Sequence, residues 1–235
     1  MSRVGNFSSS QIYRLMSKGR GNWSLENIGA AFKSYVKEKQ WERKLGRSLS
    51  KDVSARPTTW GTLVEQQCFN VLDLKYSLVS KERFKHKELT EYWTGMPDVL
   101  TTDLVGDIKC PYTMESFCGL VDALESAEVL KAHSPMYYWQ LVSNSILCNR
   151  ENAVLIVYCP LKKDLEEIRE LARTEGEQLQ NQFAWINWAE DAELPYIPEK
   201  SEYMDVNLLE FKVSEEDKEL LTERVKLAVN MLNKN

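Results

Sequence analysis

One run of seven apolar residues, from Ala153 to Cys159, constrains the fold more than any other feature of the sequence. A continuous apolar run of this kind is typical of a strand buried on both faces inside a sheet. Such a sheet has to be covered by helices on both sides. Amphipathic helical patterns flank the run, over residues 135–147 and 165–189. The sequence therefore predicts an α/β sandwich with a mixed sheet flanked by helices.

The rest of the chain adds helices and two short strands to this sheet. Serines precede apolar positions at helical spacing, which predicts a capped helix over 8–18. Apolar periodicity predicts further helices over 25–43, 60–74, 115–130 and 215–232. We expect adjacent strands over 98–102 and 104–109, joined by a turn, and irregular structure over 44–59 and 190–212. No repeat or long Pro/Gly/Ser linker divides the chain, so we expect a single domain.

Composition narrows the class of protein. The length of 235 residues and the hydrophobic share of 43% are those of an ordinary globular protein. No apolar run approaches the roughly 20 residues that a membrane span needs, and the first ten residues lack the apolar stretch of a signal peptide. We therefore expect a cytoplasmic protein. The five cysteines include no C-x-x-C pair, which argues against a zinc or iron–sulfur site.

Charge is distributed unevenly along the chain. The net charge is −5, but residues 161–235 contain 10 basic and 18 acidic residues, which leaves 20 basic and 17 acidic residues in 1–160. Within the latter, residues 31–56 contain eight basic residues and three acidic ones. A basic N-terminal part followed by an acidic C-terminal part suits a protein that binds phosphate on one face. A solvated, lysine-rich helix face explains the stretch 31–56 equally well.

The segment 95–111, Gly-Met-Pro-Asp-Val-Leu-Thr-Thr-Asp-Leu-Val-Gly-Asp-Ile-Lys-Cys-Pro, contains the candidate chemistry. Asp107 and Lys109 are two residues apart on a predicted strand, so their side chains share a face. Asp98 lies beside them if the two strands pair. Mg²⁺ commonly binds one or two carboxylates together with waters and phosphate. In the alternative reading, Asp98 and Asp103 are turn residues and Asp107 with Lys109 is an exposed ion pair.

Two further polar residues occur in apolar helical patterns. Glu65 lies in Trp-Gly-Thr-Leu-Val-Glu-Gln-Gln-Cys-Phe, and Gln140 lies in Ser-Pro-Met-Tyr-Tyr-Trp-Gln-Leu-Val-Ser-Asn. Each can also be read as a polar residue at the boundary of the core. The neighbours Tyr137, Tyr138 and Trp139 offer rings for base stacking, but aromatic clusters on helices more often form core, and we favour core.

Taken in order, these motifs resemble the PD-(D/E)XK nucleases of the lambda-exonuclease or viral-recombinase type, over roughly residues 3–160. The pieces are Trp60-Gly-Thr-Leu-Val-Glu65, Gly95-Met-Pro-Asp98, Asp107-Ile-Lys109-Cys-Pro and Tyr137-Tyr-Trp-Gln140. The resemblance implies a restriction-endonuclease-like core over about 1–160 and a C-terminal helical extension over about 161–235. The second acid is Asp107, where the family more commonly has glutamate.

The resemblance also implies roles for individual residues. Metal would be bound by the carboxylates of Asp98 and Asp107 and by the backbone carbonyl of Ile108. Glu65 would bind or support a second ion, with Mg²⁺ expected and Mn²⁺ possible. Lys109 would orient or deprotonate the attacking water.

Gln140 would steady the active site or the substrate. Family members also bind a DNA phosphate with an arginine and a serine/threonine run that opens a helix. Arg3 and the residues Ser8, Ser9 and Ser10 occupy that place in this chain, and a helix N-terminus is a natural anion site. Simple helix capping by the serines is an equally good reading.

The function implied is a Mg²⁺-dependent exonuclease that digests linear double-stranded DNA from the 5′ end. Its single-stranded product would pass to a single-strand annealing protein in phage-type recombination. Ring-forming relatives imply a homotrimer, with residues 31–56 facing a channel and the apolar face of helix 161–182 as one candidate interface. The alternatives are an endonuclease or Cas4-like nuclease with the same core, or a catalytically silent DNA-binding protein. Buried charges held together without a use argue against the silent protein.

Overall fold

The main sheet of the protein has four strands in the order β4-β5-β6-β7. The computed structural model describes residues 4–22, 24–49, 55–72, 76, 82–178 and 182–234, with the side chains of 175–178 left aside. The strands are β4 (Val99–Leu100), β5 (Leu104–Lys109), β6 (Asn152–Tyr158) and β7 (Val206–Lys212). β5 and β6 are parallel, whereas β4 and β7 pair antiparallel with their neighbours. The sheet is therefore mixed.

A second, smaller sheet holds the N-terminal segment against the chain that leads into β4. Its strands are β1 (Phe7–Ser8), β3 (Trp93–Gly95) and β2 (Phe84–Lys85), in the order β1-β3-β2. β1 runs parallel to β3, so Ser8 lies beside Thr94. This pairing brings the start of the chain close to the Gly-Met-Pro-Asp motif.

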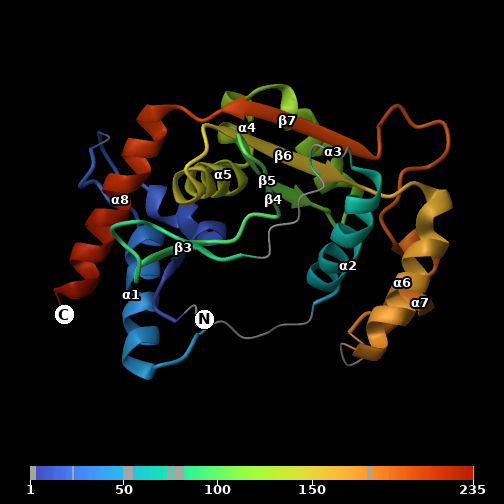
Figure 1. The fold of residues 1–235 in the computed structure, drawn as a ribbon, viewed down its shortest axis with the longest axis horizontal. Helices are drawn as coiled ribbons and strands as arrows, with labels where there is room; N and C mark the ends of the chain where they lie inside the picture. Colours follow the sequence, from blue (N-terminus) through green and yellow to red (C-terminus); the bar gives the residue numbers. More distant parts are fainter. Residues whose placement is uncertain are drawn as a thin grey trace.

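Helices cover both faces of the main sheet (Figure 1). On one face lie η1 (Ser9–Met16), α1 (Ala30–Leu45), α3 (Met114–Asp122), η3 (Ala123–Glu125), α4 (Ala127–His133), α5 (Pro135–Cys148) and α8 (Glu215–Asn233). The other face is covered by α2 (Arg56–Val71), α6 (Leu165–Gln178) and α7 (Ala184–Trp188). Two short turns, η4 (Lys162–Asp164) and η5 (Asp191–Glu193), connect these elements. The expected α/β sandwich is confirmed.

Side chains along β5 alternate between the two faces of the sheet, and each face packs into its own core cluster. Val105 packs with α5 and α8, whereas Leu104 and Ile108 pack with α2 and α6. Asp107 and Lys109 have the same parity as Val105, so their side chains lie on the α5 face. The run Ala153–Cys159 is buried throughout, as a strand covered by helices on both faces requires.

Several predicted helices differ from those observed. The N-terminal helix is a 3-10 helix that Ser8 does not cap, because the Ser8 hydroxyl lies 3.3 Å from the Ser10 hydroxyl instead. α1 begins at Ala30, since the preceding residues form a turn closed by an isolated bridge between Lys18 and Ile28. The prediction of irregular structure over 44–59 is wrong at both ends, because α1 and α2 extend into this segment. Residues 50–54 lie outside the described residues.

The helix predicted over 115–130 is divided into two α-helices, with the short 3-10 helix η3 continuing from the first. Its second part, α4, begins after Ser126, whose hydroxyl accepts a hydrogen bond from the Val129 backbone. The helix predicted over 165–189 is likewise divided into α6 and α7. Both helices bury apolar residues in the same cluster, among them Ile168 and Ile186, so their combined pattern mimics one continuous helix.

The irregular structure expected over 190–212 is wrong for its last third, which forms β7. This strand pairs with β6 along seven residues and turns Leu209 and Phe211 toward the core. The sequence signal is weak because the adjacent apolar pair Leu208-Leu209 breaks the alternation of an edge strand. The expected helical extension over about 161–235 thus contains a strand of the main sheet.

Within the described residues, no helix combines the length and apolar character needed to cross a membrane.

Candidate functional site

The candidate site lies where β4 and β5 meet. Val99 pairs with Gly106 in antiparallel register, which places Asp98 directly beside Asp107. The Asp98 backbone nitrogen donates to the Gly106 carbonyl over 3.1 Å. The Ile108 backbone nitrogen donates in turn to Asp98 Oδ2 over 2.8 Å. Two carboxylates on adjacent strands are therefore fixed side by side by backbone bonds.

Asp107 is held on both of its oxygens although its side chain is only 2% exposed. Gln140 on α5 donates from Nε2 to Oδ1 over 2.8 Å. The Lys109 ammonium forms an ion pair with Oδ2. A buried carboxylate needs such partners, because burial without them is strongly unfavourable. The structure thus brings together four predicted site residues, Asp98, Asp107, Lys109 and Gln140.

The electrostatics of the site are those of crowded carboxylates around one ammonium. Burial raises the pKa of Asp98 well above its usual range, and the charges of Asp107 and Glu65 raise it further. Burial on its own lowers the pKa of Lys109, but the carboxylates of Asp107 and Asp98 more than compensate and hold it above its usual value. Lys109 therefore stays charged, whereas Asp98 is protonated at neutral pH unless a further cation beside it favours the ionised form.

Glu65 joins this group from the opposite side of the sheet. It lies half-buried on α2, near enough for its charge to act on Asp98. Over the residues that the structure describes, no three Asp, Glu, His or Cys side chains come close enough together to hold a metal ion. The donor set nevertheless fits a hard cation that binds one or two carboxylates and keeps waters. The Asp98 and Asp107 carboxylates would supply such oxygens, and the Ile108 carbonyl follows Asp107 along the chain.

The aromatic residues beside Gln140 divide between two roles. Tyr138 and Trp139 are core residues, 4% and 5% exposed, as expected. Tyr137 is half-buried, and Lys109 Nζ lies 5.2 Å from the centroid of its ring. Tyr137 therefore belongs to the surroundings of the site. Its place in the sequence next to two core aromatics concealed this role.

The predicted phosphate-binding residues are separated by the structure. Arg3 lies outside the described residues. Ser8 and Ser10 are near the surface, and their hydroxyls contact each other. Ser9 is 2% exposed, and its hydroxyl lies 2.8 Å from that of Ser143 in the interior. The expectation that Ser9 binds phosphate is thus corrected, because its hydroxyl serves to join η1 to α5.

Asn144 is a residue that the sequence analysis missed. It is fully buried on α5, and among the described residues neither polar atom of its amide has a hydrogen-bond partner. A Cβ atom on Gly95 would meet Asn144 Oδ1 at 2.5 Å and Ser9 Oγ at 2.3 Å. Gly95 therefore permits β3 to approach α5 closely, three residues before Asp98. The signal in the sequence was its position four residues after Gln140, on the same face of the predicted helix.

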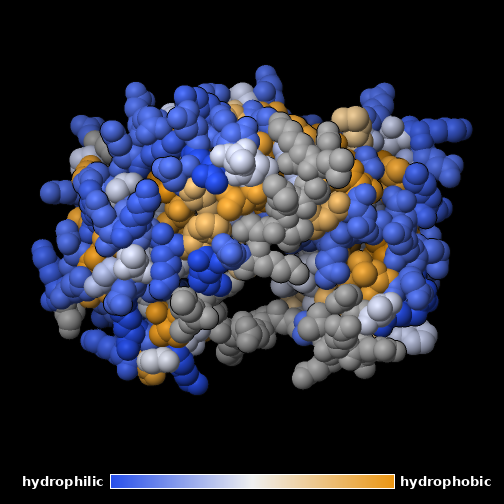
Figure 2. Space-filling view, viewed as in Figure 1, coloured by the Kyte–Doolittle hydropathy of each residue, from blue (hydrophilic) through white to orange (hydrophobic). Residues whose placement is uncertain are grey.

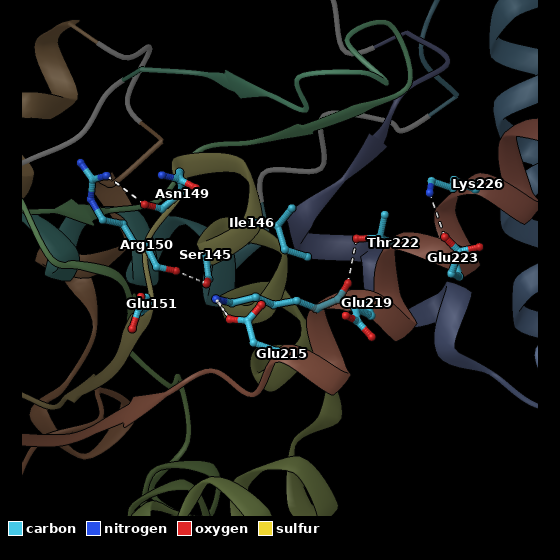
Figure 3. Close-up of a pocket in the computed structure, with 11 residues that line it drawn as sticks. Ser145, Ile146, Asn149, Arg150, Glu151, Glu215, Glu219, Thr222, Glu223 and Lys226 are labelled. Carbon is cyan, nitrogen blue, oxygen red and sulfur yellow. Dashed lines mark hydrogen bonds and ion pairs between the residues drawn. The ribbon is translucent and has the colours of Figure 1, made fainter.

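A cleft lies between the C-terminal end of α5 and the helix α8 (Figure 3). Charged side chains line it, and two lysine–glutamate pairs are formed among them. Lys218 binds Glu215, and Lys226 binds Glu223, at 2.7 and 2.8 Å. Arg150 is bound to backbone carbonyls, among them that of Thr101. Both of these ion pairs lie within α8, between residues three positions apart.

Comparisons with known proteins agree with the fold. No protein-family model matches the chain, and no curated protein matches it by sequence. Among solved structures, an alkaline exonuclease from Laribacter hongkongensis is similar, with a TM-score of 0.62 and 13% identity, covering 99% of this chain and 90% of that one. Its complex with dAMP gives a TM-score of 0.61 and 14% identity, with the same coverage of both chains.

A phage-related exonuclease from Haemophilus somnus 129PT is similar to the same degree. The TM-score is 0.63 at 14% identity, and the match covers 97% of this chain and 94% of the other. The chain has the fold of these exonucleases. It is the restriction-endonuclease-like fold, with a mixed sheet flanked by helices, that the sequence predicts. At these identities the likeness concerns the fold, so the activity has to be argued from the site.

Proposed function

We propose that the protein is a metal-dependent deoxyribonuclease that digests linear double-stranded DNA as an exonuclease, from the 5′ end. One observation carries the proposal: Asp98 and Asp107 lie side by side, with Lys109 paired to the second acid and Gln140 fixing it. The fold similarity to an alkaline exonuclease and to a phage-related exonuclease supports it.

Each side chain has a defined task in this proposal. Asp98, Asp107 and the Ile108 carbonyl bind Mg²⁺ or Mn²⁺, and Glu65 binds or supports a second ion. When bound, the metal supplies positive charge to the phosphate that is attacked and lowers the pKa of a water. Lys109 orients that water, and Gln140 keeps Asp107 in its binding orientation.

The proposed substrate is held by contacts to its phosphates. Of the basic residues in 31–56, Lys33, Lys37, Lys44 and Arg47 are exposed and free to serve. Lys39 is turned inward and paired with Glu42 over 2.9 Å, so the basic face is smaller than the sequence suggests. Enclosure of DNA by a homotrimeric ring would multiply these contacts, and we propose such a ring.

The apolar face of helix 161–182 is not available as the interface of that ring. Leu165, Ile168 and Ala172 are buried in the core beneath α2. Light scattering at micromolar concentration tests the ring. A mass near the 27.3 kDa of one chain would contradict it.

The test of the activity uses end-labelled linear DNA and closed circular DNA, each with Mg²⁺ and with EDTA. We expect nucleotides to be released from the linear duplex alone, only with Mg²⁺, and 5′ label to be lost first. Asp107→Asn should abolish the release. Asp103→Asn, which changes an exposed aspartate of the adjacent turn, is the matched control and should retain it.

Cleavage of closed circles would favour an endonuclease with the same site. Binding of DNA with no cleavage under any metal would favour the silent DNA-binding protein. The single-strand annealing partner is part of the proposal, because a resected strand needs a protein to pair it. Co-purification of such a protein with the chain, resistant to DNase treatment, tests that part.

A further inference from the structure

A groove of about 310 Å³ lies where the chain leaves β6 and where it approaches β7. The Ile197 backbone nitrogen donates to the Pro160 carbonyl over 2.8 Å, and the Lys162 backbone nitrogen donates to the Ile197 carbonyl over 3.1 Å. These bonds fix the two walls of the groove relative to each other. Figure 1 shows this junction, where the loop before β7 lies near the start of α6.

The floor of the groove is mainly aliphatic. Ile197 is 1% exposed and Leu161 is half-buried, and both line the groove together with Pro198 and Tyr203. Tyr203 is 37% exposed, and its ring makes an edge contact with Phe117 at 5.8 Å between centroids. One side of the Tyr203 ring is therefore held in place while the rest of it faces solvent. A groove of this kind can receive an apolar side chain.

Three lysines surround this apolar floor, namely Lys162, Lys163 and Lys200. All three are exposed, and none forms an ion pair within the part of the chain that the structure describes. Glu199 is the one acidic residue found among the described residues that line the groove. The groove therefore concentrates positive charge.

This concentration differs from the surroundings of the groove. Most of the molecular face drawn in Figure 2 is hydrophilic, and residues 161–235 contain 18 acidic and only 10 basic residues. Six other basic residues of this part are already bound to carboxylates or backbone carbonyls, namely Arg169, Arg173, Lys212, Lys218, Arg224 and Lys226. The lysines of the groove lack such partners, so their charge is available to an anion.

The backbone of Lys200 is strained. Its φ angle is +69°, in the left-handed region that lysine rarely adopts. The turn that contains it is closed by a hydrogen bond of 3.3 Å from the Ser201 backbone nitrogen to the Pro198 carbonyl. Glycine would adopt this conformation at no steric cost. Strained residues of this kind gather at binding sites, and this one lines the groove.

From these observations we propose that the groove docks an acidic segment of a partner protein. An apolar side chain of that segment lies on the floor, and its carboxylates meet Lys162, Lys163 and Lys200. Complementary charge selects an acidic partner. The mainly aliphatic floor suits a peptide side chain better than a nucleobase, which stacks on aromatic rings. The inference does not depend on the proposed nuclease activity, because none of the described residues assigned to that activity lines the groove.

The first experiment measures binding of a fluorescein-labelled peptide, Asp-Asp-Glu-Asp-Asp-Leu-Phe, to the full chain in EDTA by fluorescence anisotropy. We expect saturable binding that weakens as salt is added, because salt screens exposed charges. The same peptide with asparagine and glutamine in place of its acidic residues should not bind. Absence of saturable binding by the acidic peptide would overturn the proposal.

The second experiment locates the peptide with a triple variant, Lys162→Gln, Lys163→Gln and Lys200→Gln. Exposed ion pairs are individually weak, so loss of all three should weaken binding roughly 3- to 150-fold. The matched control changes three exposed lysines outside the groove to glutamine, namely Lys18, Lys87 and Lys234. Both variants have the same net charge, so an equal loss of binding in the two would show attraction without a site.

Lys200→Gly separates the charge of this residue from its backbone. Glycine relieves the strained φ angle, so the variant should melt at no lower temperature than wild type. Peptide binding should nevertheless weaken roughly 1.5- to 5-fold through loss of one ammonium group. Unchanged binding by this variant would exclude Lys200 from the site and overturn the proposed set of lysines.

The apolar floor is tested with a second peptide, in which serines replace the leucine and phenylalanine. Wild type should prefer the original peptide, and Tyr203→Ser should reduce that preference. Trp188→Ser, which changes a residue that is 86% exposed outside the groove, is the matched control and should keep it. Equal binding of the two peptides by wild type would mean that the lysines attract any acidic chain, and would contradict the docking site.

Two other occupants are distinguished in the same assays. Displacement of the bound peptide by an oligothymidylate, with the same dependence on the three lysines, would assign the groove to nucleic acid and overturn the proposal. Light scattering of the triple lysine variant shows whether a second copy of this chain occupies the groove. A lower mass than wild type would assign the groove to contacts between copies and likewise overturn it. Cleavage of linear DNA by the triple variant should match wild type, so failure of the docking site and failure of the proposed activity are separate results.

Discussion

Gln140 Nε2 on α5 donates a hydrogen bond of 2.8 Å to Asp107 Oδ1 on β5. Both side chains are almost completely buried, at 8% and 2% exposure. The bond fixes the rotation of the Asp107 carboxylate and leaves Oδ2 directed at Lys109. A buried amide on α5 thus positions a charged group on the neighbouring strand.

Gln140→Met should therefore reduce turnover while leaving the fold intact. Hydrogen bonds to charged groups contribute about 1.5–3 kcal/mol, so we expect turnover to fall roughly 10- to 100-fold. KM should change little, because Gln140 acts through Asp107. Gln66→Met, on the exposed face of α2, is the control for the loss of an amide. Turnover within twofold of wild type would show that Asp107 needs no such support.

Asp98→Asn tests the crowding of carboxylates. Burial and the charges of Asp107 and Glu65 raise the pKa of Asp98 in the folded protein above its ordinary value of 3.8. Between about pH 4 and the folded pKa of about 9, Asp98 is ionised in the unfolded chain but protonated in the folded protein, so stability falls as the pH rises through this window. The asparagine variant can still accept the Ile108 hydrogen bond and should lose all cleavage.

The metal-free asparagine variant should also be more stable than wild type. We expect a gain of about 1 kcal/mol at pH 7, or roughly 2–4 °C in Tm, and no gain at pH 3.5, where both chains are neutral at this position. Thermal melts in EDTA across this pH range provide the measurement. Asp103→Asn should show no such dependence. A lower Tm for Asp98→Asn at pH 7 would contradict the assigned electrostatics.

Features encoded locally could be predicted from the sequence. The apolar run that forms β6 and the paired strands that hold Asp98 and Asp107 depend on short-range pattern and register. The two acids meet because a tight turn joins their strands, and the turn itself is visible in the sequence. The position of Gln140 on a buried helix was predicted from its apolar neighbours, but its bond to Asp107 depends on how α5 lies over the sheet.

Features that depend on distant partners could not be predicted. β7 is a strand because β6 offers it a free edge, and nothing in residues 206–212 alone requires this. Ser9 is internal because Ser143, far away in sequence, lies opposite its hydroxyl. The cleft lined by Tyr13, Tyr112 and Tyr137 is assembled from separate parts of the fold, so these tyrosines are scattered along the chain. The periodicity of apolar residues predicts that one face of a helix or strand is buried. It does not identify the element that covers this face.

Lys109→Met removes the only cation found beside Asp107 among the described residues. A buried carboxylate left without its partner destabilises a fold by about 3–5 kcal/mol, so the metal-free variant should melt at a lower temperature than wild type. Mg²⁺ should restore part of this loss, since a cation then neutralises the carboxylates. Turnover should fall roughly 100-fold or more, the scale of a positioned acid–base group.

Calorimetry of Mg²⁺ binding separates two roles for this lysine. Retained metal binding with lost turnover supports a role toward the attacking water. Lost metal binding, with turnover rescued by high Mg²⁺, would mean that Lys109 only shapes the metal site. Lys163→Met, an exposed lysine of η4, should change neither quantity.

Glu42 on α1 anchors the N-terminal segment from inside the protein. Its side chain is 1% exposed and accepts hydrogen bonds from the Gly5 backbone, the Lys39 ammonium and the Leu49 backbone, at 2.9, 2.9 and 3.1 Å. Burial alone would raise the pKa of Glu42, but these bonds outweigh it and hold the pKa below its ordinary value of 4.5. The charged form is therefore the one that the fold stabilises.

Glu42→Gln should destabilise the protein by about 3 kcal/mol at pH 7, because Lys39 loses its buried partner. The corresponding fall in Tm is roughly 6–12 °C for a domain of this size. A folded-state pKa below the unfolded one gives stability that is complete above about pH 4.5 and is lost as the pH falls through the folded value. The difference between wild type and variant should accordingly shrink below pH 4.5 in urea titrations. Glu26→Gln, an exposed glutamate, should match wild type throughout. A difference for Glu42→Gln that stays constant from pH 7 to pH 3 would show that the charge of Glu42 contributes nothing, and that the variant merely packs less well.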